Sequence, residues 1–198
     1  MFTSANPGAG KTFVSSNLAM SIAQTNKKVV LVDVDIRKGT LSGIFSNSSN
    51  RMGLTHYLSG STDKVDDIVG TSEEYEKLDV IFSGPVPPNP AELLLSERFD
   101  RLIAELRKRY DYIIVDNVPA GMVADASIVN RVADLTIFVV RSGVMDRRQL
   151  PELENMYLQE QLRNMSVILN GVPSERRGYG YGYGYGYGYG YGYGYHYR

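Results

Sequence analysis

The sequence predicts an α/β fold, a mainly parallel sheet flanked by helices, and two observations carry that prediction. Segments typical of strands alternate with segments typical of helices along most of the chain, as in sheets whose parallel strands are joined by crossover helices. The strand segments are also continuous apolar runs, such as KVVLVDVD (residues 28–35) and YIIVD (residues 112–116). Runs of this kind indicate strands that are covered on both faces.

The first elements surround a glycine-rich loop. Residues 1–4 (MFTS) read as the end of a strand that is short for a complete one, so we expect the chain to be cut inside or just before its first strand. Residues 11–24 are predicted to form a helix whose apolar stripe is Val14, Leu18 and Ile22. Strands are expected at 28–35 and 78–84, and the polar segment 47–77 between them has only weak helical patches.

The second half continues the alternation. One helix is predicted to start just after Pro90 and run to residue 110. Its expected buried face is Leu95, Phe99, Leu102, Ile103 and Leu106. Strands are expected at 112–116, 135–143 and 165–171, and helices around 124–132 and 147–162. We expect a catalytic domain over residues 1–177 and a low-complexity, disordered tail over 178–198, because a Gly-Tyr repeat has no aliphatic residues to build a core.

Composition excludes several classes of function. The 198 residues suit one domain, and the absence of cysteine excludes disulfides, a thiol nucleophile and thiolate metal sites. Residues 1–177 carry 20 basic and 22 acidic side chains, so there is no electrostatic argument for nucleic acid or an anionic membrane, and no nucleic-acid partner is expected. Neither a membrane-spanning run nor a signal peptide is visible.

The segment SANPGAGKT (residues 4–12) carries the most specific chemistry. Its last residues, Gly10-Lys11-Thr12, match the end of the phosphate-loop pattern G-x-x-x-x-G-K-[ST], although Ala5 replaces the first glycine of that pattern. Loop and helix N–H groups would hold phosphate, the lysine would reach the β- and γ-phosphates of ATP, and the threonine would bind Mg²⁺. The expected nucleotide-binding residues are Pro7, Gly8, Ala9, Gly10, Lys11 and Thr12. A glycine-rich turn is the alternative, and the expected strand before and helix after favour nucleotide binding.

Carboxylates follow two of the expected strands. Asp33 and Asp35 end one strand, and Asp116 ends another. The carboxyl ends of parallel strands form the crevice in which α/β sheets bind ligands, and carboxylates there can hold Mg²⁺ or accept a proton. Strict alternation would point Asp33 and Asp35 to opposite sides, unless the chain bends. An aspartate at a strand end is often only a turn residue, but three such sites in one domain favour a functional cluster.

Together these motifs resemble those of the bacterial tyrosine kinases, which belong to the MinD/ParA-like branch of P-loop ATPases. ANPGAGKT, VLVDVDIRKG and YDYIIVDNVPAGMVADA are similar to the Walker A, A′ and B motifs, and GPVPPNPAELLLSERFDRLI matches the stretch before Walker B. The resemblance implies an ATP-dependent autokinase of capsule and exopolysaccharide assembly. It implies catalytic roles for Lys11, Asp33 and Asp35, Mg²⁺ ligands at Thr12, Asp33 and Asp116, and an adenine contact at Asn170.

The resemblance also implies partners and a location. These are a membrane-spanning polysaccharide co-polymerase or adaptor, neighbouring kinase subunits that receive the tail in their sites, and a phosphotyrosine phosphatase, at the cytoplasmic face of the plasma membrane. Two features depart from the family pattern. Asn117 and Val118 are atypical, and the Glu-x-x-Arg-x-x-Arg oligomerisation motif and the adaptor are absent from this sequence.

Glycine alternates with tyrosine in the tail, and the resemblance makes it a phosphoacceptor cluster. The expected acceptors are Tyr179, Tyr181, Tyr183, Tyr185, Tyr187, Tyr189, Tyr191, Tyr193, Tyr195 and Tyr197. Taken alone, the tail is better explained as a disordered, adhesive aromatic segment, and the nucleotide site in the same chain favours phosphoacceptors instead. The alternative function for the whole chain is a MinD/ParA-type ATPase switch. Against it, Asn6 stands where that group has its signature lysine.

Overall fold

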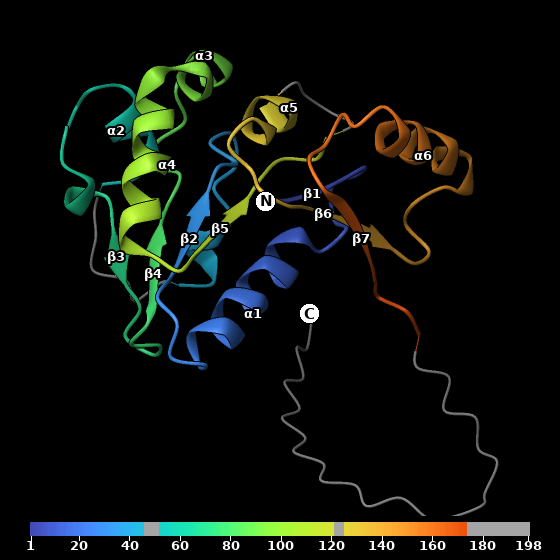
Figure 1. Ribbon diagram of the computed structural model, residues 1–198, viewed down its shortest axis with the longest axis horizontal. Coiled ribbons are helices and arrows are strands. Elements are labelled where there is room, and N and C mark those ends of the chain that lie inside the picture. The colour runs from blue at the N-terminus through green and yellow to red at the C-terminus, as the bar shows by residue number, and fades with distance from the viewer. Residues whose placement is uncertain (46–51, 121–124, 174–198) are drawn as a thin grey trace, which may run out of the picture.

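The computed structural model describes residues 1–45, 52–120 and 125–173, and its centre is one seven-stranded sheet (Figure 1). The strand order is β3-β4-β2-β5-β1-β6-β7, and every neighbouring pair is parallel except β3 with β4. The strands are β1 (Phe2–Ser4), β2 (Val29–Asp33), β3 (Gly70–Thr71), β4 (Leu78–Ile81), β5 (Tyr112–Asp116), β6 (Thr136–Arg141) and β7 (Met165–Asn170). The mainly parallel α/β fold expected from the sequence is therefore confirmed.

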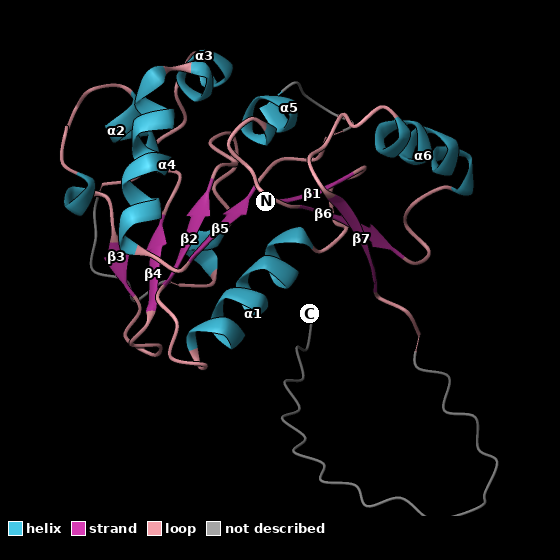
Figure 2. Cartoon of the chain, viewed as in Figure 1, coloured by secondary structure: helices cyan, strands magenta, loops and turns pink. Residues whose placement is uncertain are grey.

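Helices cover both faces of the sheet (Figure 2). They are α1 (Lys11–Ala23), α2 (Leu54–Leu58), α3 (Pro90–Leu95), α4 (Glu97–Arg109), α5 (Asp125–Asn130) and α6 (Leu150–Leu158), with 3-10 turns at Leu41–Gly43, Val65–Asp67 and Arg147–Gln149. Strand alternation divides the core in two, as β2 shows. Val30 and Val32 pack with the residues of α4, whereas Val29 and Leu31 pack with those of α1.

The predicted stripe of α1 is not its most buried face. Val14, Leu18 and Ile22 are only partly buried, while Ala19 and Ser16 are almost inaccessible. Small residues face the sheet because α1 packs against the strands β1, β2, β4 and β5. Small side chains let the helix lie close to the strands, so the larger aliphatic residues flank the contact rather than fill it.

The prediction of a single helix after Pro90 is wrong, because the structure has two helices there, α3 and α4. The break falls at Ser96, whose backbone is extended with φ −67° and ψ 151°. Leu95 was expected in the buried stripe, but the break turns it outward and leaves it 57% exposed, while Leu94 is buried. The rest of the expected face, on α4, is buried as predicted: Phe99, Leu102, Ile103 and Leu106.

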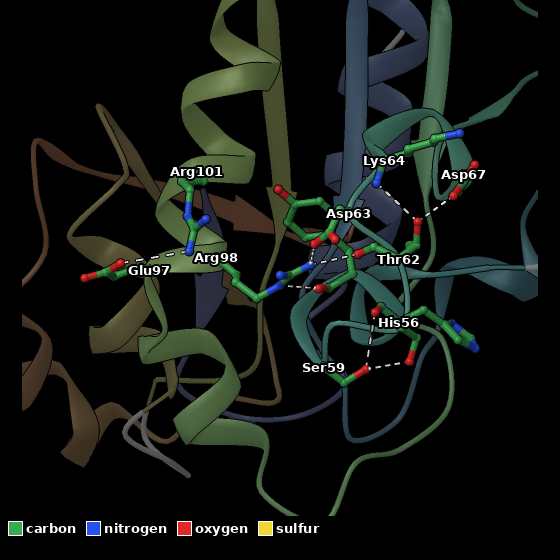
Figure 3. A network of polar contacts seen from close by, with 11 residues as sticks. His56, Ser59, Thr62, Asp63, Lys64, Asp67, Glu97, Arg98 and Arg101 are labelled. Atoms are coloured by element: carbon green, nitrogen blue, oxygen red, sulfur yellow. Dashed lines mark hydrogen bonds and ion pairs between the residues drawn. The ribbon is translucent and has the colours of Figure 1, made fainter.

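Arg98 of α4 connects that helix to α2 and to the segment after it (Figure 3). Its guanidinium donates to the carbonyls of Tyr57 and Thr62, at 2.7 Å each, and to the carboxylate of Asp63. It also lies 4.9 Å from the centre of the Tyr57 ring. An arginine bonded to carbonyls and stacked on an aromatic ring fixes a segment that has little secondary structure of its own.

Within the described ranges, no helix has the length and apolar character to cross a bilayer.

Candidate active site

The loop between β1 and α1 has the backbone of an anion-binding loop. Gly8 and Gly10 adopt left-handed conformations, with φ 76° and 91°, which glycine tolerates because it has no Cβ. Gly10 is also the N-cap of α1, and no side chain caps the helix there. The first N–H groups of a helix lack partners within the helix and carry partial positive charge. This end of α1 therefore offers N–H donors to a phosphate.

Thr12 and Asp116 are brought together at that end of α1. The Thr12 hydroxyl donates a 2.6 Å hydrogen bond to Oδ2 of Asp116, which is 1% exposed. Oδ1 of Asp116 is buried and accepts no hydrogen bond of good geometry in the described part of the chain, although the Ser15 hydroxyl is close enough to Asp116 to oppose the increase in its pKa. A buried carboxylate oxygen without a partner is costly unless something else binds it. The hydroxyl and this oxygen are the ligand types that Mg²⁺ prefers.

Asp33 lies next to Asp116 in the sheet, because the two residues are register partners on β2 and β5. Its two oxygens each accept a backbone hydrogen bond of 3.1 Å, from the N–H groups of Asp35 and Leu41. Burial raises the pKa of Asp33 to about 7, and the carboxylates of Asp116 and Asp35 add to the increase. The two N–H groups oppose it because they stabilise the charged form.

The pKa of Asp116 is also raised, again first because of burial. The Thr12 hydroxyl and the Lys11 ammonium oppose that increase, and the carboxylate of Asp35 adds to it. The site thus combines buried carboxylates that repel one another with one nearby ammonium group. Such a cluster favours a bound cation or a proton.

Asp35 joins the cluster because the chain leaves β2 after Asp33. The next N–H, that of Val34, still donates to the carbonyl of Asp116, at 2.9 Å, and the chain turns after it. Asp35 then caps this turn, as its carboxylate accepts from the N–H of Lys38 at 3.2 Å. It is 8% exposed and acts electrostatically on both Asp33 and Asp116. The chain therefore bends after β2, so the strict alternation that would place Asp33 and Asp35 on opposite sides of the strand does not apply here.

Of the other expected site residues, the structure describes Asn170, Ala9 and Pro7 but not the tail tyrosines. Asn170, at the end of β7, touches the loop, since its amide nitrogen donates to the Ala9 carbonyl at 2.9 Å and its oxygen accepts from Gly171. Ala9 is buried and Pro7 is exposed. The ten tail tyrosines lie outside the described residues.

Contacts to the loop from β6 and from the 3-10 turn after it were not anticipated. Arg141, at the end of β6, donates to the Gly8 carbonyl at 2.9 Å, and the Asn6 amide donates to Gln149 at 2.9 Å. An arginine at the end of a strand next to β1 would place a cation beside the loop, but the sequence did not indicate which strand lies next to β1.

No set of three or more His, Asp or Glu side chains within residues 1–45, 52–120 and 125–173 is arranged to hold a metal ion by itself.

Comparison with known proteins identifies the family. The model of the AAA domain family matches residues 2–157. Tyrosine-protein kinase CpsD of Streptococcus pneumoniae is 39% identical over 168 residues, covering 85% of this chain and 73% of the relative. The kinase domain of Escherichia coli tyrosine kinase ETK superposes with a TM-score of 0.80 at 38% identity, covering 93% of this chain and 71% of that one.

The fold is shared by a more distant structure, the septum site-determining protein MinD of Pyrococcus horikoshii complexed with Mg-ADP. It gives a TM-score of 0.68 at 23% identity, covering 85% of this chain and 68% of that one, and so shows a shared fold alone. The kinases are much closer in sequence, which decides against the MinD/ParA-type switch. This chain therefore belongs to the bacterial tyrosine kinases of capsule and exopolysaccharide assembly, and it is an ATP-dependent protein-tyrosine kinase domain.

Proposed function

We propose that the β1–α1 loop holds the phosphates of ATP and that Asp33, Asp35 and Asp116 form the catalytic centre beside it. The contact between the Thr12 hydroxyl and Asp116 carries this proposal, because it joins the uncapped start of α1 to the acidic end of the sheet. Lys11 is the first residue of α1, and its ammonium acts electrostatically on Asp116. A lysine at this position can follow the negative charge that develops on the β- and γ-phosphates during transfer.

The same residues fit Mg²⁺ as the companion of ATP. The Thr12 hydroxyl and the Asp116 oxygen without a partner are oxygen donors at the phosphate end of the site. Asp33 is a third, although both of its oxygens already accept backbone hydrogen bonds. When bound, Mg²⁺ would supply positive charge that neutralises the phosphate oxygens. It would also relieve the repulsion among the buried carboxylates.

Asp33 is the proposed proton acceptor for the tyrosine substrate. In the transfer, the phenol oxygen forms a bond to the γ-phosphorus, and the bond from that phosphorus to the β–γ bridging oxygen breaks, releasing ADP. The phenol proton passes to the Asp33 carboxylate. Burial raises the pKa of Asp33 in the metal-free site, which favours acceptance of a proton by this carboxylate. Asp35, which raises that pKa through its charge, supports the role of Asp33.

The proposed acceptors are the ten tyrosines of residues 178–198, and the acceptor site is that of the same or a neighbouring subunit. The segment from Pro173 onward spans at most about 80 Å when extended, so either arrangement is within reach. Asn170 is proposed as an adenine contact in addition to its contact with the loop. By family, the proposed partners are a membrane-spanning polysaccharide co-polymerase at the cytoplasmic face of the plasma membrane and a phosphotyrosine phosphatase.

The experiment is transfer of labelled γ-phosphate from ATP to the purified protein, with and without Mg²⁺. The wild-type chain should become labelled on tyrosine, and a chain lacking residues 178–198 should hydrolyse ATP without becoming labelled. Asp33→Asn should abolish labelling while retaining ADP binding. Equal labelling of the wild-type and tail-deleted chains would show that the acceptors are elsewhere, and equal labelling of wild type and Asp33→Asn would remove Asp33 from the chemistry.

A further inference from the structure

We propose that Arg141 and Asn170 are positioning residues that orient two peptide groups of the phosphate loop toward the bound phosphates. The inference rests on the proposed nucleotide site and adds to it residues at the ends of β6 and β7. These two strands lie on one side of β1 in the sheet, whereas β5 and β2, which carry Asp116 and Asp33, lie on the other (Figure 1).

The two contacts hold consecutive carbonyl groups of the loop. An Arg141 guanidinium nitrogen lies 2.9 Å from the Gly8 oxygen, and the Asn170 amide nitrogen lies 2.9 Å from the Ala9 oxygen. The carbonyl of one residue and the N–H of the next share one planar trans peptide, in which they point in opposite directions. Holding the Gly8 carbonyl toward β6 therefore directs the Ala9 N–H away from it, and holding the Ala9 carbonyl toward β7 does the same for the Gly10 N–H.

The direction away from β6 and β7 is the direction of the acidic centre. Because β1 lies between β6 and β5, an N–H turned away from β6 faces the side of the sheet on which Asp116 meets Thr12. Phosphate loops work by presenting N–H groups to phosphate oxygens, and a peptide rotated the other way would present a carbonyl oxygen instead. The two side chains thus select the peptide orientation that binds an anion.

Two glycines accommodate this arrangement. A Cβ added at Gly10 would overlap the Asn170 amide, so the loop residue beside Asn170 has no space for a side chain. A Cβ added at Gly171 would lie 3.2 Å from Cγ of Arg141, so the Arg141 stem packs closely against the residue that follows β7. Asn170 is fixed in turn by the Gly171 N–H, which donates to its oxygen at 2.8 Å and leaves the amide nitrogen directed at the loop.

Pyrophosphate distinguishes positioning from an adenine contact, because it has neither adenine nor ribose. Binding of pyrophosphate and of ADP, each with Mg²⁺, is measured by calorimetry for wild type, Arg141→Ala, Arg141→Lys and Asn170→Ala. Arg148→Ala is the matched control, because this arginine is 90% exposed and pairs with Asp146. Arg141 is exposed too, so its replacement should not prevent folding, and the urea midpoint of each variant verifies this.

We expect Arg141→Ala to weaken pyrophosphate and ADP by the same factor, about fivefold to tenfold, as for loss of one hydrogen bond. Asn170→Ala should weaken pyrophosphate by a similar factor and ADP by at least as much, because Asn170 is also the proposed adenine contact. The loss should persist at high ionic strength, and Arg141→Lys should recover part of it. The inference is overturned if both alanine variants bind pyrophosphate as wild type does, or if Asn170→Ala weakens ADP alone. It is also overturned if the Arg141 effect disappears in salt and Arg148→Ala shares it, which would indicate net charge. Failure of both wild type and Arg148→Ala to bind either ligand would instead overturn the nucleotide site itself.

Discussion

Asp33 and Asp116 are register partners at the ends of β2 and β5, and both carboxylates are buried. Asp116 is held by the hydroxyl of Thr12, whereas the hydrogen bonds to Asp33 from the described residues come from backbone N–H groups. Two buried carboxylates side by side are unfavourable while both are charged, so this pair is the part of the site that depends most on protons and cations.

The metal-free protein should become less stable as pH rises, because the folded state then loses the proton that it holds on Asp33. Its pKa is about 7 in the folded protein and near 3.8 when unfolded, so between these values the folded state binds the extra proton and loses stability as pH increases. Asp33→Asn should remove a large part of this pH dependence. The part removed should be on the order of a few kcal/mol in the free energy of unfolding, summed between the unfolded and folded pKa values. Urea unfolding between about pH 5 and pH 7 measures it.

Glu97→Gln is the control for that series, because the Glu97 side chain is 92% exposed. It should reproduce the wild-type slope. If Asp33→Asn has the same slope as wild type, Asp33 does not hold its proton in the folded state, and its proposed role as a base near neutral pH loses its main support.

Lys11→Met should abolish phosphorylation of the tail while leaving the fold intact. The ammonium of Lys11 lies near Asp116, and its proposed task is to stabilise charge on the transferred phosphate. Lys27→Met is the matched control, since Lys27 is an exposed residue beyond the other end of α1. Phosphotyrosine blotting with unfolding curves for both variants is the measurement. Full phosphorylation of folded Lys11→Met would refute the phosphate-loop assignment.

The hydroxyl of Thr12 should govern the dependence on Mg²⁺. Thr12→Val removes the proposed ligand and the hydrogen bond to Asp116, so the Mg²⁺ concentration needed for half-maximal activity should rise at least about tenfold. Thr12→Ser should restore it. Thr25→Val is the control, because that hydroxyl donates only to the carbonyl of Ile22 near the end of α1. An unchanged Mg²⁺ requirement in Thr12→Val would exclude this hydroxyl as a ligand.

The tail should control association of the subunits. Each phosphate adds about −1.5 to −2 charge, so four would add roughly −6 to −8 to a body of net charge −2. Unmodified protein should associate weakly, and phosphorylation or deletion of residues 178–198 should yield monomers. Light scattering of the three samples at low and high salt tests this. A ring that survives deletion of the tail would show that the body has an interface of its own.

The sheet and the proximity of Asp33 to Asp116 could be predicted from the sequence, because both depend on local signals. Continuous β-branched runs identify buried strands, and the carboxyl ends of parallel strands meet at one edge, which is why Asp33 and Asp116 were expected together. The break at Ser96 was missed because the residues on both sides continue a helical pattern, and only an extended backbone at one residue separates α3 from α4.

The supports of the phosphate loop could not be predicted in the same way. The contact between Arg141 and the Gly8 carbonyl joins residues 133 positions apart, and it depends on β6 lying beside β1. The family pattern suggested an adenine contact for Asn170, but it did not indicate that the same amide holds the Ala9 carbonyl. Such contacts follow from strand order and from the absence of a Cβ at Gly10, which become evident only when the chain is folded.

Mass spectrometry of the C-terminal peptides after incubation with Mg-ATP tests the proposed transfer most directly. We expect mass increases in whole numbers of phosphates on residues 178–198, with fragment ions assigning them to tyrosine. The increases should be absent in Lys11→Met and in Asp33→Asn, and present in Lys27→Met. Release of inorganic phosphate by the wild-type chain with no phosphate on any tail tyrosine would contradict the proposal, because the site would then hydrolyse ATP without transferring phosphate to the tail.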